Sequence, residues 1–85
     1  MKSDELMHVV ELLEAGRWEE AHVLVDAESS GIGAWLHGIV HTIEGDASNA
    51  AYWYRAARRP FPGLSAVTAE LAAARRALSA ISDDR

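Results

Sequence analysis

The stretch HTIEGDASNAAYWYRA, residues 41–56, contains a Gly-Asp pair that separates two segments of helical pattern. Gly45 is expected to end the helix before the pair, and Asp46 is expected to cap the helix after it. Asn49 stands three residues beyond the cap, where its side chain could reach back toward the turn. A phosphate or sugar contact at this helix N-terminus is the alternative, but Asp46 would repel an anion. We therefore interpret Gly45, Asp46 and Asn49 as structural residues.

The spacing of apolar residues on both sides of this turn predicts an all-α protein. Apolar residues three and four positions apart predict a helix over about 34–44, and the helix after the turn is expected over about 47–59. Two segments are expected to break the helical pattern: SSGIG, residues 29–33, and RRPFPG, residues 58–63. No strand pattern competes with the helices.

Small polar residues and glycine are expected to set the ends of the other helices. Ser3 and Ser65 are expected to cap the first and last helices, and Gly16 is expected to end the first. A second helix is expected to start near Trp18. The sequence thus predicts about five helices in one domain, residues 1–85, arranged as a hairpin over 3–30, a hairpin over 33–59 and a capping helix over 65–82.

The second hairpin resembles a tetratricopeptide repeat (TPR) at five positions. The glycine, the two alanines, the aromatic residue and the closing proline of the repeat correspond to Gly38, Ala50, Ala57, Tyr54 and Pro62. His37 and His41 stand where the repeat has leucine and tyrosine, and Trp35 lies one place late. The resemblance implies two degenerate TPR-like hairpins that bind a protein partner. The string over residues 37–55 also resembles one in small bacterial and fungal proteins, and that resemblance implies no catalytic role.

Composition argues against several classes of function. The net charge of −5 argues against a nucleic-acid partner, because phosphate binding needs a basic surface. The absence of cysteine excludes disulfides and thiolate metal sites. Acidic residues follow the single lysine of MKSDEL, which is unlike a signal peptide, and no apolar run approaches the ~18 residues of a membrane span. We expect a cytoplasmic protein with no membrane contact.

Three polar residues form a stripe along the helix predicted over 34–44. His37, His41 and Glu44 lie at i, i+4 and i+7, which places them within about 60° of one another around the helix. Two imidazoles one turn apart can ligate a divalent metal such as zinc with a carboxylate, and His22 could supply a fourth ligand. Structural histidines bonded within the core are the favoured interpretation, with no cofactor. Small-molecule or proton chemistry is a further alternative.

The aromatic run at residues 52–54 suggests an interaction surface, because consecutive helical residues point 100° apart and cannot share one face. The candidate surfaces are a groove lined by Trp35, Ile39, Thr42 and Trp53, or a flank formed by Tyr52, Arg55 and Arg59. We therefore predict an interaction module that binds a protein partner or itself, rather than an enzyme. The alternatives are a metal- or ligand-binding protein, or an enzyme, that uses the His37, His41 and Glu44 stripe, and an accessory subunit of a larger enzyme.

Overall fold

The computed structural model describes residues 2–28 and 30–83, with side chains described as far as residue 81, and Ser29 of the predicted SSGIG break lies outside the described residues. The described chain forms five α-helices and no strand, which confirms the all-α prediction. The helices are α1 (Ser3–Glu14), α2 (Trp18–Val25), α3 (Gly31–Glu44), α4 (Ala47–Ala56) and α5 (Val67–Asp83). None of these helices is long and apolar enough to cross a bilayer.

The turn between α3 and α4 has the predicted structure. Gly45 adopts a left-handed conformation with φ of 90°, and its N–H donates to the carbonyls of His41 and Thr42. The Asp46 carboxylate accepts a hydrogen bond from the backbone N–H of Asn49 at 3.2 Å. Asn49 therefore contributes to the cap through its backbone, whereas the sequence pattern suggested its side chain.

α3 is the central helix, because its residues 33–42 are all buried and it packs against each of the other four helices. It packs tightly against α4 at Gly38. A Cβ placed on Gly38 would lie 2.6 Å from Cδ1 of Tyr54, so only glycine permits this packing. Ala50, also on α4, is fully buried beside the same contact. Two of the matched repeat positions, Gly38 and Tyr54, thus meet in the helical hairpin.

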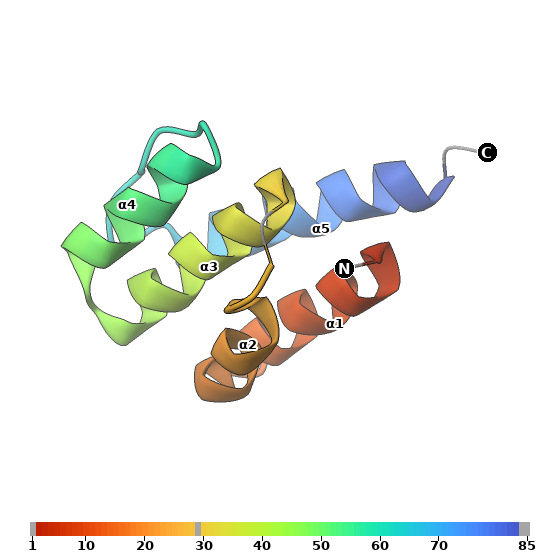
Figure 1. The fold of residues 1–85 in the computed structure, drawn as a ribbon, viewed down its shortest axis with the longest axis horizontal. Helices are drawn as coiled ribbons and strands as arrows, with labels where there is room; N and C mark the ends of the chain where they lie inside the picture. Colours follow the sequence, from red (N-terminus) through yellow and green to blue (C-terminus); the bar gives the residue numbers. More distant parts are fainter. Residues whose placement is uncertain (1, 29, 84–85) are drawn as a thin grey trace.

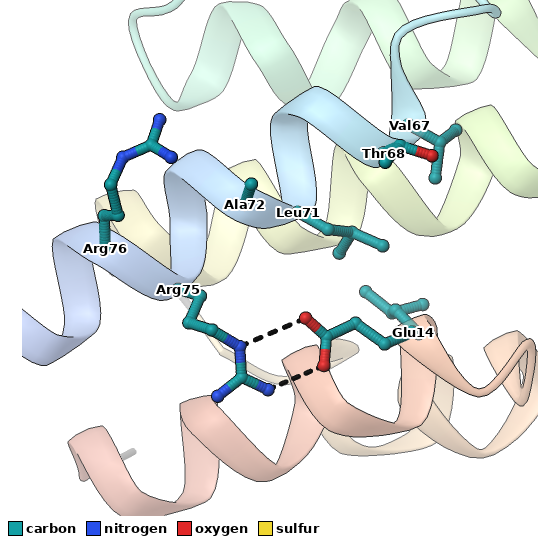
Figure 2. Close-up of a pocket in the computed structure, with 8 residues that line it drawn as sticks. Glu14, Val67, Thr68, Leu71, Ala72, Arg75 and Arg76 are labelled. Carbon is teal, nitrogen blue, oxygen red and sulfur yellow. Dashed lines mark hydrogen bonds and ion pairs between the residues drawn. The ribbon is translucent and has the colours of Figure 1, made fainter.

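α5 runs along α1 and α3 and closes the bundle (Figure 1). Leu71, Ala74 and Leu78 form its buried stripe. At the exposed edge of the groove between α1 and α5, Arg75 donates two hydrogen bonds to the Glu14 carboxylate, at 2.6 and 3.1 Å (Figure 2). This pair lowers the pKa of Glu14, because the guanidinium stabilises the carboxylate. The pair links α5 to α1 at the surface.

Several helix ends differ from the prediction by one to three residues. The N-cap residue of α1 is Lys2 rather than Ser3, and the backbone N–H of Lys2 donates a hydrogen bond to Oε1 of Glu5 at 3.1 Å. α3 begins at Gly31, three residues early, because Ser30 caps it by accepting a hydrogen bond from Gly33. α5 begins at Val67, two residues after the expected Ser65 cap.

α4 ends at Ala56, three residues before the predicted end at 59. Pro60 disfavours helical geometry at Arg59, so the helix must terminate earlier. Arg58 takes the left-handed position with φ of 60°, and the N–H of Arg59 donates back to the carbonyl of Tyr54. A C-terminal motif that usually uses glycine is here made by an arginine.

Candidate metal centre

Three of the four histidines meet where α2 packs against α3. His37 and His41 lie one turn apart on α3, and His22 faces both of them from α2. The ring centroids are 5.0 Å apart for His22–His37, 5.1 Å for His22–His41 and 5.0 Å for His37–His41. We call these three residues the histidine cluster. Its candidate ligand nitrogens all lie within 4.8 Å of one another.

His22 enters the cluster because of its place on a short amphipathic helix. Ala21 and Val25 are the fully buried residues of α2, and they hold the helix against the core. His22 follows Ala21 directly, so it lies at the margin of the buried face, where its side chain is 36% exposed. From the sequence, His22 was predicted only as a candidate fourth ligand. Helical periodicity does not show which residues of two different helices come together.

His37 is the most buried member, at 2% exposure, and its Nδ1 has no hydrogen-bond partner in the described part of the chain. Burial lowers the pKa of His37 to about 4, with smaller contributions from His41 and His22 and an opposing one from Asp26. The ring is therefore neutral at pH 7. A neutral imidazole is the form that binds a metal ion.

His41 is oriented by a carboxylate from its own helix. Its Nδ1 donates a hydrogen bond to Oε1 of Glu44 at 2.8 Å, since an ionised carboxylate can only accept. This bond leaves Nε2 of His41 free to bind an ion. Metal-bound histidines commonly carry such a carboxylate partner, which fixes the ring and raises its basicity.

Glu44 was predicted as a direct ligand, and its geometry allows two roles. With His41 and Asp46 it forms a second group whose ligand atoms lie within 4.8 Å, but both carboxylates are exposed. In the histidine cluster it supports His41 instead. We favour the supporting role, because the Glu44 oxygen is already bonded to His41 Nδ1 and the buried imidazoles are better suited to a transition metal.

An aromatic ring from α4 covers one side of the cluster. Trp53 stacks on His37 with ring centroids 3.8 Å apart and an angle of 9° between the planes. Tyr52 packs edge-on against Trp53 and is 55% exposed. Trp53 was predicted to contribute to an interaction groove, and its half-buried ring instead supports the histidine cluster.

The predicted groove is not a surface. Trp35 and Ile39 are buried in the core, and Thr42 is buried with its hydroxyl donating to the carbonyl of Gly38 at 2.8 Å. The prediction failed because the whole middle of α3 is enclosed by other helices. On the predicted flank, Tyr52, Arg55 and Arg59 are all exposed. The Cζ atom of Arg59 lies 3.5 Å from the centroid of the Trp35 ring, so the guanidinium covers that ring.

The Trp35 ring is also held from α5. Its Nε1 donates to Oε1 of Glu70 at 3.0 Å, and the Tyr54 hydroxyl donates to the same oxygen at 2.7 Å. Burial together with Glu70 raises the pKa of Tyr54 above its ordinary value. This arrangement ties α3, α4 and α5 together and is structural.

Three imidazoles form a nitrogen donor set that suits zinc, copper and nickel. Zinc binds imidazole nitrogens at about 2.0–2.1 Å, so tetrahedral ligands lie roughly 3.4 Å apart. Small rotations of the three side chains would bring nitrogens that lie within 4.8 Å to that spacing.

Comparison of the chain with protein-family models, with curated proteins and with solved structures gave no match.

Proposed function

We propose that this protein binds one divalent transition-metal ion through His22, His37 and His41. The observation that carries the proposal is the convergence of three imidazoles from two helices within 4.8 Å. Nδ1 of His37 is buried without a hydrogen-bond partner in the described part of the chain, and an ion bound at that atom would offset the cost of burying it unpaired. Glu44 orients His41 in support of the ion.

Thermal unfolding tests the proposal. A ligand that binds one site at 100 times its dissociation constant stabilises the fold by about 2.7 kcal/mol, which is roughly 10–20 °C for a domain of this size. Zn²⁺ or Ni²⁺ should raise the melting temperature of the wild type, and EDTA should reverse the rise. His22→Ala should abolish the response, because His22 is the ligand supplied by α2.

His8 provides the matched control, because it is an exposed histidine on α1 outside the cluster. His8→Ala should leave the metal response intact. An equal metal response in wild type and His22→Ala would contradict the proposed site.

A second candidate function, binding of a protein partner, is favoured by an apolar groove between α1 and α2. Val23 is 76% exposed, and Leu24 is also exposed beside Leu12. Acidic residues border this groove: Asp4, Glu5 and Glu20. A second copy presenting the same face would bring like charges together, so we propose a basic partner. A lysine-flanked amphipathic peptide should bind wild type more tightly than Val23→Ser, and Tyr52→Ser on α4 is the control.

A further inference from the structure

Among the described residues, the histidine cluster offers three ligands, so a tetrahedral ion bound there would have one position without a protein ligand. Three imidazoles converge, while Glu44 is engaged by Nδ1 of His41. Asp26, the C-cap residue of α2, places Oδ1 3.9 Å from Nε2 of His22 and lies outside the converging group. Zinc sites with three protein ligands keep a fourth position for solvent or substrate, whereas structural zinc sites have four protein ligands.

The exposure of the three rings indicates where that position lies. His37 and His41 are buried, and Trp53 covers the face of His37 toward α4. His22 is the member that reaches solvent, and the neighbouring Asp26 side chain is largely exposed. An ion in the cluster is therefore approached from the edge of α2 that carries His22 and Asp26.

We infer that the ion bound by the histidine cluster has an exchangeable fourth position, open to solvent beside Asp26, which takes water, hydroxide or a small anion. The inference rests on the proposed metal-binding function. Asp26 would act as a positioning residue: its carboxylate would accept a hydrogen bond from water bound at the fourth position and would weaken, without preventing, the binding of a small anion there. A metal-bound water loses a proton more readily than bulk water, so a bound ion would also supply hydroxide at this position.

Azide binding to the Co²⁺-loaded protein tests the inference. Co²⁺ replaces zinc in nitrogen sites and has visible absorption bands that respond to a change of ligand. Adding azide should shift these bands and saturate at one azide per cobalt. If cobalt binds and azide leaves the bands unchanged, the fourth position is closed and the inference fails. If no cobalt binds to the cluster, the proposed metal-binding function itself fails, and this inference fails with it.

Asp26→Asn distinguishes a positioning residue from a ligand. A unit charge about 5 Å from the azide, in an aqueous environment, changes its affinity by roughly fourfold at low salt. Asp26→Asn should therefore bind azide roughly fourfold more tightly, with the same final spectrum as the wild type. Asp4→Asn removes an equal charge from α1 and should leave azide affinity unchanged. If azide binds only after Asp26→Asn, Asp26 is the fourth ligand and the position is closed in the wild type.

Discussion

The low pKa of His37 makes the metal-free protein sensitive to acid, and His37→Leu should remove that sensitivity. The folded pKa of about 4 lies below the ordinary value of 6.5, so the unfolded chain takes up a proton first as the pH falls. The stability that depends on the neutral ring is complete above pH 6.5 and is lost progressively between about pH 6.5 and 4. Leucine fills a similar apolar space and does not titrate.

The size of the effect follows from the two pKa values. With 6.5 for the unfolded chain and about 4 for the folded one, lowering the pH from 7.5 to 5 destabilises the fold by about 2 kcal/mol through His37 alone. His41 and His22 contribute to the lowered pKa of His37, so the number applies to the difference between wild type and variant. A difference of this size corresponds to roughly 10 °C in melting temperature.

Urea unfolding at pH 5, 6, 6.5 and 7.5 in EDTA, followed by circular dichroism, measures the difference. The free energy of unfolding of wild type minus that of His37→Leu should fall by about 2 kcal/mol from pH 7.5 to 5. His8→Leu removes an exposed imidazole from α1 and controls for the loss of a histidine. A difference between wild type and His37→Leu that stays constant over this range would refute the assignment of a buried, neutral His37.

Three further predictions concern packing around α3 and the α4 ring that covers the cluster. Gly38→Ala should destabilise the fold by about 2 kcal/mol relative to Gly31→Ala in chemical denaturation, because its Cβ would press on Tyr54, whereas nothing lies within 4 Å of a Cβ at Gly31; equal stabilities would contradict the close contact. Tyr54→Phe should cost roughly 1–2 kcal/mol in the same assay through loss of the 2.7 Å bond to Glu70, and no loss would mean that solvent replaces that bond. One equivalent of Cu²⁺ should quench tryptophan fluorescence, and Trp53→Phe should remove most of the quenching, because this ring stacks on His37; undiminished quenching in the variant would place the ion elsewhere.

The sequence predicted the helices and the α3–α4 turn because those features depend on local spacing. Gly45 and Asp46 act through backbone geometry within a few residues, so their roles are visible in the string itself. Helix ends were less accurate where a neighbouring residue competes, as Pro60 does for the end of α4. The TPR-like arrangement remains a proposal, although the matched Gly38 and Tyr54 are in contact.

The candidate site was predicted in part for the same reason. His37 and His41 share a helix, and their spacing alone places them together. His22 and Trp53 come from other helices, and only tertiary packing brings them to the cluster. The prediction of an interaction groove was wrong for the same reason. Apolar spacing on α3 does not distinguish a surface that binds a partner from one that the other helices of the chain cover.

Nuclear magnetic resonance of the imidazole groups during a zinc titration tests the metal site most directly. The chain has four histidines, and long-range ¹H–¹⁵N spectra report the state of each ring. Zinc should shift the signals of His22, His37 and His41 together and saturate at one equivalent, while the signals of His8 stay in place. Movement of His8 alone, or shifts of the other three that never saturate at one equivalent, would contradict a metal site built from the histidine cluster.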